Sequence, residues 1–304
     1  MKMNLNGIFP PVTTPIEADG SVSVGRLREN ISKYNATRLA GYVVNGSTGE
    51  SVLLTWEEVE RAWIGVREAA ASEKILIAGT GAESTAETIV HTNRAAAIGY
   101  HAALVRTPSY FKSQMNPAAL AEHFLRVADA SKIPVLIYSV PQFTGVAVEA
   151  PLVARLSEHP NIVGIKESSG NVQRIGEMIA AASPKFQLLA GSAATIFPSL
   201  AMGAAGGILA LACALPELCV ELYEAARNEQ LDRARALQQQ LLAPSSILVA
   251  KYGVGGLKYA LDRLGYFGGA ARPPLLPPDE SAKREIDSVL AGVTTSVAKE
   301  TSSR

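Results

Sequence analysis

One lysine in this sequence has the position of an amine nucleophile. Lys166 lies near the end of the short apolar segment NIVGIKES, and a strand period of two places it on the same face as Gly164 and Ile162. On an inward face the ammonium group loses water, which lowers the pKa of a lysine. An amine with a lowered pKa attacks carbonyl carbons to form imines. The alternative is a lysine that faces outward or pairs with Glu167.

A phenol and a hydroxyl-rich turn are two further candidates. Tyr138 is near the end of the preceding apolar run, 134–139, and a phenol beside an amine can transfer protons. The turn Gly46–Glu50 has the sequence GSTGE, whose hydroxyls and backbone N–H groups suit a carboxylate. Each feature also has a structural interpretation, as a core tyrosine or as an ordinary turn before a helix.

The sequence contains no motif typical of a nucleotide-binding or metal-binding site. The segment Gly79–Ala82 lacks the third glycine of a dinucleotide-binding fingerprint, and no phosphate-binding GxxxxGK[ST] loop occurs. No histidine is spaced as a metal ligand, and the two cysteines, which lack a CxxC spacing, are expected as buried thiols. We therefore predict no metal site.

These residues need a scaffold, and the chain repeats one kind of unit eight times. Short apolar runs of strand type begin at residues 7, 41, 74, 102, 134, 162, 186 and 206, and most are separated by one helical segment. Alternating strands and helices predict parallel strands with right-handed crossovers. We expect an α/β fold, a (β/α)8 TIM barrel, whose catalytic residues lie at the carboxyl ends of the strands.

The last part of the chain is helical in pattern. Residues 1–225 are expected to form the barrel with the catalytic site, and residues 226–304 a C-terminal helical extension with a frayed polar end from Thr294. Helices are expected at 55–71, 85–98, 117–130, 150–157, 217–227, 230–242, 256–263 and 281–290. Thr55 and Ser84 have the acidic residues that follow N-caps.

Composition narrows the class of protein further. The 304 residues hold 28 basic and 28 acidic side chains, a balance without the basic excess of a general nucleic-acid binder. Two cysteines fit a reducing cytosol, and we expect a cytoplasmic protein. The uncharged stretch 186–216 is interrupted by proline and glycine, so no membrane span is predicted. Zero net charge weakly favours self-association.

Several motifs together resemble the dihydrodipicolinate synthase / N-acetylneuraminate lyase family of Schiff-base aldolases. They occur in family order over about residues 1–270, and they are GIFPPVTTP (7–15), GSTGE (46–50), GTG (79–81), TPSY (107–110), YSVP (138–141) and GIKE (164–167). The resemblance implies a (β/α)8 barrel with a C-terminal helical region, which is usually a homotetramer, a dimer of dimers.

The resemblance also implies roles for individual residues. Lys166 would form an imine with pyruvate, Tyr138 would relay protons, and Ser47 and Thr48 would hold the pyruvate carboxylate. Tyr110 would reach into the site of a neighbouring subunit. The imine serves as the electron sink, so no separate cofactor is expected; the enamine adds to an aldehyde, and the reverse reaction cleaves a 4-hydroxy-2-oxo acid. Further substrate contacts are expected from Ser139, Gly191, Ser192 and Leu209.

The identity of the aldehyde depends on a single position. Phe143 occupies the place of an arginine that binds the carboxylate of aspartate semialdehyde in dihydrodipicolinate synthases, and phenylalanine makes no such contact. Other segments, such as HPNIVG (159–164) and GYFGG (265–269), look more like 4-hydroxy-2-oxoglutarate aldolase. We therefore predict cleavage of 4-hydroxy-2-oxoglutarate to pyruvate and glyoxylate.

Other functions remain open beside that prediction. The first alternative is a 4-hydroxy-tetrahydrodipicolinate (dihydrodipicolinate) synthase that condenses pyruvate with aspartate semialdehyde. A non-catalytic keto-acid-binding relative and a metal-dependent aldolase on the same fold are two further alternatives, and the presence of Lys166 and Tyr138 counts against the non-catalytic one.

Overall fold

Eight parallel strands form a closed barrel. The computed structural model describes residues 3–301, and its strands neighbour one another in the order β1-β8-β7-β6-β5-β4-β3-β2. Backbone hydrogen bonds just beyond β1 close the ring, because Val12 N donates to Val43 O and Val43 N donates to Pro10 O. The strands are Gly7–Phe9 (β1), Gly41–Val44 (β2), Ile75–Gly79 (β3), Ala102–Arg106 (β4), Val135–Ser139 (β5), Ile162–Glu167 (β6), Gln187–Ala190 (β7) and Gly206–Ile208 (β8).

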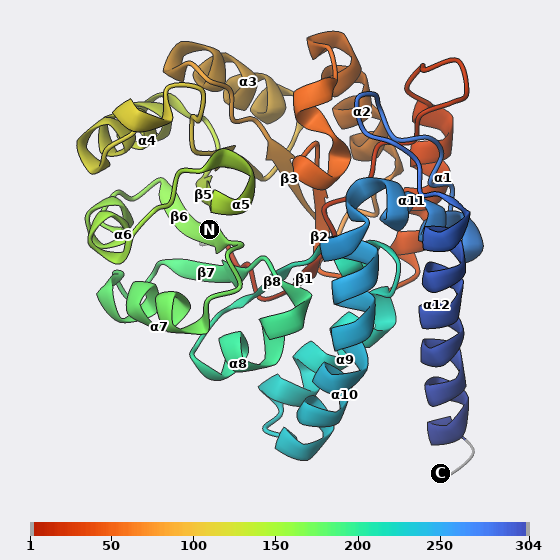
Figure 1. Ribbon diagram of the computed structural model, residues 1–304. Coiled ribbons are helices and arrows are strands. Elements are labelled where there is room, and N and C mark those ends of the chain that lie inside the picture. Colours follow the sequence, from red (N-terminus) through yellow and green to blue (C-terminus); the bar gives the residue numbers. More distant parts are fainter. Residues whose placement is uncertain (1–2, 302–304) are drawn as a thin grey trace.

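A ring of helices covers the outside of the barrel (Figure 1). Thr55 caps α2 in a capping box with Glu58, and Ser84 caps α3, as the sequence predicts. These helices are Val24–Asn35 (α1), Trp56–Ala69 (α2), Thr85–Ile98 (α3), Pro117–Ala130 (α4), Ala150–Ser157 (α6), Val172–Ala181 (α7), Ile196–Ala201 (α8) and Pro216–Arg227 (α9). The short helix Pro141–Thr144 (α5) instead follows β5 at the mouth of the barrel.

The buried side chains form two clusters, one on each side of the strand wall. Phe9, Val43, Leu136 and Leu189 belong to the cluster inside the barrel, where alternate strand residues point. Their strand neighbours belong to the larger cluster between strands and helices, for example Ile8 and Val44. Because both faces of every strand are covered, the strands are apolar on both sides.

The C-terminal extension packs against one side of the barrel (Figure 1). It consists of Leu231–Pro244 (α10), the π-helical segment Ser245–Lys251, Gly253–Arg263 (α11) and Glu280–Thr301 (α12). Pro244 lies inside the last turn of α10, where its missing N–H favours the change from α-helix to the wider π-helix. This change carries the chain back towards the mouth of the barrel.

The sequence predicted all eight strands and the barrel, and the structure confirms this fold. β1 and β8 end well before the apolar runs 7–12 and 206–212 on which they were predicted. β1 ends at Phe9 because Pro10 and Pro11 follow, and β8 ends at Ile208, before the short 3-10 turn Ala210–Cys213. The helix expected at 281–290 runs on to Thr301. The expected fraying of this end remains a prediction, and residues 302–304 lie outside the described part.

The boundary expected at residue 225 falls within the last turn of α9, which packs beside β1 as the final helix of the barrel. Within residues 3–301, no helix is both long enough and apolar enough to cross a membrane.

Candidate active site

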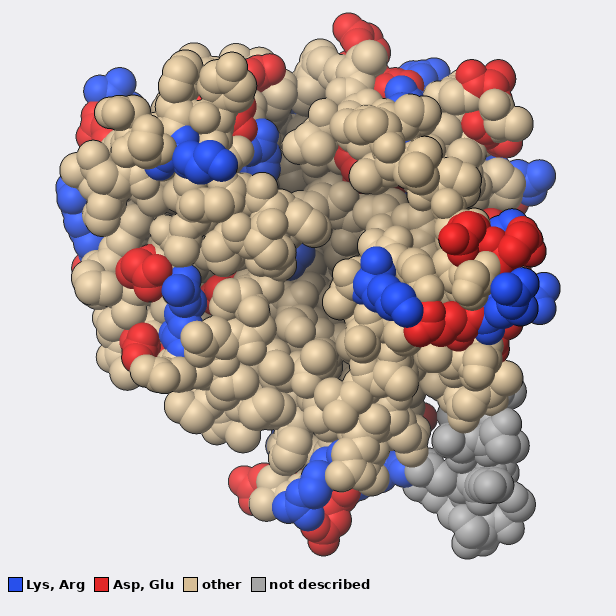
Figure 2. Space-filling view, in the orientation of Figure 1, with Lys and Arg blue, Asp and Glu red and all other residues tan. Residues whose placement is uncertain are grey.

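A cavity of about 120 Å³ opens at the carboxyl ends of the strands. Figure 2 shows a hollow in the middle of this face, and most of its rim is uncharged. Six polar side chains line the cavity: Ser47, Thr48, Tyr138, Gln142, Lys166 and Ser168. They come from several different strand ends and loops, as expected of an active site in a barrel of this kind.

Lys166 and Tyr138 lie side by side on the inner face of the barrel wall. They are register partners on β6 and β5, and Lys166 Nζ is 4.2 Å from the centre of the Tyr138 ring. Both side chains are about 95% buried, with exposed fractions of 4% and 5%. The structure therefore settles the question left open by the sequence: Lys166 faces inward.

Glu167 points to the opposite side of the wall and does not pair with Lys166. Its carboxylate accepts hydrogen bonds from the backbone N–H of Ser169. Burial raises the pKa of Glu167, and the bonds from Ser169 oppose that rise. Lys166 consequently stands without a carboxylate partner among the described residues, with the aromatic face of Tyr138 beside its ammonium group.

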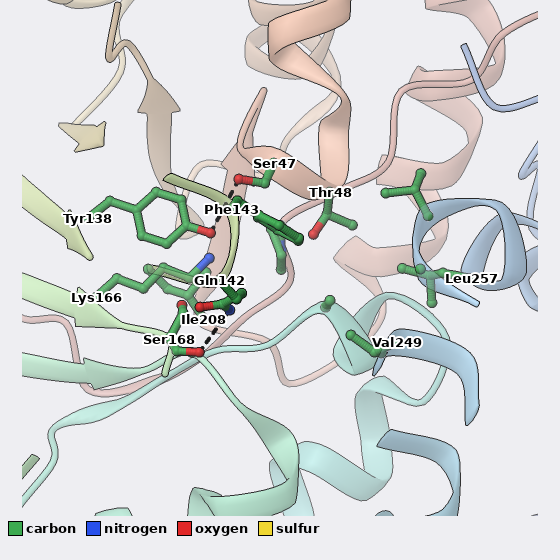
Figure 3. Close-up of a pocket in the computed structure, with 15 residues that line it drawn as sticks. Ser47, Thr48, Tyr138, Gln142, Phe143, Lys166, Ser168, Ile208, Val249 and Leu257 are labelled. Carbon is green, nitrogen blue, oxygen red and sulfur yellow. Dashed lines mark hydrogen bonds between the residues drawn. The ribbon is translucent and has the colours of Figure 1, made fainter. Parts of the chain in front are cut away.

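The turn after β2 brings two hydroxyl groups to the cavity. It is the 3-10 turn Ser47–Gly49, flanked by Asn45 and Glu50, which both have left-handed backbones with φ of 57° and 60°. Ser47 Oγ lies 3.3 Å from the hydroxyl of Tyr138 (Figure 3). Ser47 and Thr48 are the first residues of the turn, where N–H groups have no partner within it. This arrangement can bind an anion such as a carboxylate.

The short helix α5 covers part of the mouth. Gln142 Nε2 donates to the carbonyl oxygen of Ser168 at 2.9 Å, which fixes α5 to the loop after β6 (Figure 3). Phe143 is 73% exposed at the rim. Beyond it a wider groove of about 860 Å³ continues past Ser192 and carries no charged side chain in its lining.

The cavity brings together five of the nine residues named from the sequence. Lys166, Tyr138, Ser47, Thr48 and Gly191 line it, and a sixth, Ser192, lines the wider groove.

The side chains of Ser139 and Leu209 lie behind the barrel wall instead. Ser139 Oγ accepts the N–H of Val148, and Leu209 belongs to the cluster between strands and helices. The expectation that they contact substrate ignored the strand period: Tyr138 and Ile208 point inward, so the next residue along points outward.

Tyr110, the ninth residue, stands outside the cavity. Its side chain is 79% exposed and packs against Phe111, with 5.0 Å between ring centres. Glu83 holds its loop, because the Glu83 carboxylate accepts the N–H groups of Ser109 and Tyr110 at 2.8 and 2.9 Å and pairs with Arg106 at 2.7 Å. Burial alone would raise the pKa of Glu83, but these three partners outweigh it and lower the pKa to about 2.

One wall of the cavity comes from residues that the sequence did not single out. Val249, Gly253, Val254 and Leu257 line it from the extension. Figure 3 shows Val249 and Leu257 on the side away from Lys166. Pro244 and the glycines that follow it were the available signals, since they interrupt the helical pattern where the chain turns back. The pattern indicated an interruption but not the direction of the turn.

The described residues contain no group of three or more His, Cys, Asp or Glu side chains placed to hold a metal ion. Cys213 and Cys219 are free, buried thiols, as predicted. Burial raises the pKa of both, which leaves them protonated and unreactive.

Comparison with known proteins now identifies the family. The model of the dihydrodipicolinate synthetase family matches residues 4–292 of the chain. The chain belongs to this family. It is therefore an enzyme of the dihydrodipicolinate synthetase family, a lyase, as the motifs indicated.

Three relatives show how similar the family members are. The 4-hydroxy-tetrahydrodipicolinate synthase of Methanothrix thermoacetophila is 36% identical over 93% of this chain and 95% of its own length. The structure of the corresponding synthase from Methylacidiphilum fumariolicum has a TM-score of 0.92 at 29% identity, covering 97% and 98% of the two chains. A dihydrodipicolinate synthase from Acinetobacter baumannii, solved in complex with pyruvate, has a TM-score of 0.92 at 30% identity, covering 96% and 99%.

These names correct one expectation. The sequence motifs favoured the pattern of 4-hydroxy-2-oxoglutarate aldolase, whereas these dihydrodipicolinate synthetase family relatives carry the name of the synthase. Neither the GYFGG nor the HPNIVG segment, on which that expectation relied, lines the active-site cavity.

Proposed function

We propose that this lyase forms an imine between Lys166 and pyruvate and joins the resulting enamine to an aldehyde. The observation that carries the proposal is the position of Lys166 Nζ, buried at the cavity wall 4.2 Å from the Tyr138 ring. An amine at the wall of a cavity can attack the carbonyl carbon of a keto acid bound beside it, and no carboxylate of the described residues pairs with this one. The A. baumannii relative, crystallised with pyruvate, supports the same substrate.

We assign a residue of the cavity to each step of the reaction. The pyruvate carboxylate binds at the turn of Ser47 and Thr48, which leaves the keto carbon near Lys166. The amine attacks that carbon, the keto oxygen takes two protons and leaves as water, and a protonated imine remains. Loss of a methyl proton then gives the enamine. The Tyr138 hydroxyl, 3.3 Å from Ser47 Oγ, carries protons to and from these intermediates.

The enamine carbon next attacks the aldehyde carbon. The aldehyde oxygen takes a proton and becomes the new hydroxyl. Water then adds to the imine and releases Lys166 with the product. Reversal of these steps cleaves a 4-hydroxy-2-oxo acid.

Borohydride trapping tests the imine directly. Incubation with pyruvate and sodium borohydride is expected to reduce the imine and attach the pyruvate carbons to the peptide that contains Lys166, as seen by peptide mass spectrometry. Lys166→Ala abolishes the modification, whereas Lys74→Met, a change at a buried lysine near the opposite end of the barrel, retains it. Unmodified Lys166 at saturating pyruvate would overturn the proposal and favour a non-catalytic relative.

The names of the relatives favour aspartate semialdehyde as the aldehyde, and hence a 4-hydroxy-tetrahydrodipicolinate synthase. The test is consumption of pyruvate in the presence of aspartate semialdehyde, followed together with formation of the cyclic product. Consumption of both substrates in equal amounts is the expected result. Pyruvate consumption that does not depend on the semialdehyde would contradict it.

A second candidate is cleavage of 4-hydroxy-2-oxoglutarate to pyruvate and glyoxylate, and Phe143 favours it. Phe143 stands exposed at the rim and offers no positive charge to the carboxylate of aspartate semialdehyde. Ser168 lines the cavity and Ser192 the groove beyond, so both can donate hydrogen bonds to a small aldehyde. Release of pyruvate from 4-hydroxy-2-oxoglutarate, compared with the condensation rate, decides between the two candidates.

Self-association is part of the proposal, because Tyr110 does not reach the cavity of its own chain. Its exposed ring, beside that of Phe111, is available to a second copy of the protein. We propose a homotetramer, a dimer of dimers, in which Tyr110 enters the neighbouring site. Sedimentation velocity measures the assembly, and a fully active monomer would contradict this part.

A further inference from the structure

A buried ion pair connects the hydroxyl-bearing turn to the C-terminal extension. Lys258 Nζ lies 2.5 Å from Glu50 Oε1, and the two side chains are 1% and 0% exposed. Glu50 follows the turn of Ser47–Gly49, and Lys258 belongs to α11. Neither residue lines the active-site cavity.

Backbone groups fix both members of the pair. The second oxygen of Glu50 accepts the N–H of Arg272 at 2.6 Å, and Lys258 Nζ also donates to the carbonyl oxygen of Ala270 at 2.6 Å. On the other side of the turn, Thr14 Oγ1 donates to Gly49 O at 2.7 Å. The turn is therefore held between the end of β1 and the extension.

The pair stands directly behind two adjoining walls of the cavity. Thr48 is two residues before Glu50, and Leu257 is the immediate neighbour of Lys258; both line the cavity. In Figure 3, Thr48 reaches the cavity from the turn and Leu257 reaches it from α11, both on the side away from Lys166. A shift of Glu50 relative to Lys258 would change the distance between these walls.

Electrostatics makes the pair sensitive to the loss of one partner. Removal of one member leaves the other as an uncompensated charge in a dry environment, which is strongly unfavourable. The remaining side chain must then move towards water or change its protonation. Removal of both charges avoids that penalty, because buried ion pairs contribute little net stability compared with uncharged residues of similar size.

We propose that Glu50 and Lys258 are positioning residues that hold the Ser47–Thr48 turn against α11 and so set the geometry for binding a keto-acid carboxylate. The inference rests on the proposed pyruvate chemistry, and it gives the extension a direct part in binding. A carboxylate bound by two hydroxyls and two N–H groups tolerates little displacement, because hydrogen bonds weaken steeply away from their preferred geometry.

The test compares Lys258→Met, Glu50→Gln and the double variant. Each single variant is expected to raise the KM for pyruvate about 10- to 100-fold, the loss found at metal sites when a residue that orients a ligand is removed. The value of kcat at saturating pyruvate should change less. The double variant should recover part of the loss in KM, and the pyruvate dependence of borohydride trapping should show the same order.

Lys74→Met is the matched control. Lys74 is also a buried lysine, and its Nζ donates to the carbonyl oxygens of Thr37 and Leu39 at 2.8 and 2.9 Å, near the amino end of β3. It should lower the unfolding temperature without changing the KM for pyruvate. This separates general destabilisation from loss of positioning.

The outcomes are distinct. If Lys258→Met and Lys74→Met destabilise alike and both leave the KM for pyruvate unchanged, the positioning role is wrong. If Lys258→Met does not fold, the double variant carries the test, and a KM equal to that of the native protein would also overturn the inference. Failure of the native protein to be trapped with pyruvate would instead refute the proposed function.

Discussion

Tyr138 and Lys166 face each other because they are register partners on neighbouring strands, with the amine 4.2 Å from the centre of the phenol ring. The strand register fixes their distance without any hydrogen bond between the two side chains. The hydroxyl of Tyr138 meanwhile points to Ser47 (Figure 3). The ring therefore lies beside the amine, while the hydroxyl at its far end is directed to Ser47.

Tyr138→Phe separates these two roles. The variant keeps the ring beside Lys166 but removes the proton carrier, so kcat should fall about 10²- to 10⁴-fold. Steady-state kinetics with pyruvate and the aldehyde measures the effect. Tyr100→Phe is the control, since Tyr100 donates to Trp63 O at 3.0 Å away from the cavity. Equal activities of Tyr138→Phe and Tyr100→Phe would show that the hydroxyl carries no proton.

Lys166→Met should make the protein inactive and more stable. The native residue keeps an amine 96% buried, whereas methionine fills similar space without a charge. We expect a gain of about 1–3 kcal/mol in the free energy of unfolding, the cost of burying a polar group without a compensating hydrogen bond. Urea unfolding measures it, and a clear loss of stability would mean that Lys166 has a favourable structural role.

Phe143→Arg tests the aldehyde. A guanidinium at this rim position can pair with a carboxylate, and one charge-assisted hydrogen bond contributes about 1.5–3 kcal/mol. The KM for aspartate semialdehyde should therefore fall about 10-fold or more, while the KM for pyruvate stays constant. Leu276→Arg, at another exposed apolar residue, is the control for added charge. An unchanged KM for the semialdehyde would show that its carboxylate binds elsewhere.

The exposed position of Tyr110 leads to a prediction that one subunit completes the active site of its neighbour. Tyr110→Phe should lower activity, and mixed oligomers of Tyr110→Phe and Lys166→Ala subunits should recover part of it. In such a mixture, a site with an intact Lys166 can receive an intact Tyr110 from its neighbour. Activity is measured after subunit exchange has been confirmed by native mass spectrometry, and no recovery after exchange would place Tyr110 outside the reaction.

The lowered pKa of Glu83 predicts that its loop, which carries Tyr110, becomes less stable in acid. Its pKa falls from an ordinary 4.5 to about 2 on folding, so the unfolded chain binds more protons between these values. The stabilisation by Glu83 is present above pH 4.5 and is lost as the pH falls towards 2. It should be small, below about 1 kcal/mol, because the side chain is 44% exposed and screened by solvent.

The measurement is the difference in unfolding temperature between native protein and Glu83→Gln from pH 6 to pH 2. The difference should be largest above pH 4.5 and shrink on acidification. Glu122→Gln, a change at an exposed carboxylate of α4, is the control. A difference independent of pH would contradict the role of the Glu83 charge.

The sequence alone was enough to predict features that follow from alternation along a strand or from a repeated unit. Strand alternation placed Lys166 and Tyr138 on one face, and the eight repeats gave the barrel. The same rule, applied consistently, would have excluded Ser139 and Leu209 from the cavity. Motif resemblance had suggested those two residues against the evidence of the strand period.

Contacts between segments far apart in the chain could not be predicted from the sequence. Lys258 and Glu50 are 208 positions apart, and nothing in local pattern joins them. The π-helical segment after Pro244 likewise depends on packing against the barrel, and it decides that Val249 reaches the cavity. Such placement follows from the assembled fold rather than from any single stretch of residues.

The wall contributed by the extension has a consequence for the order in which the protein is made. All eight strands have left the ribosome once residue 208 is exposed, but Val249, Leu257 and Lys258 follow about 40–50 residues later. Because chains emerge at about 5–20 residues per second, the barrel can close seconds before its reactive cavity is complete. The nascent chain can thus carry Lys166 in an unfinished pocket until residues 249–258 have emerged and packed against the barrel.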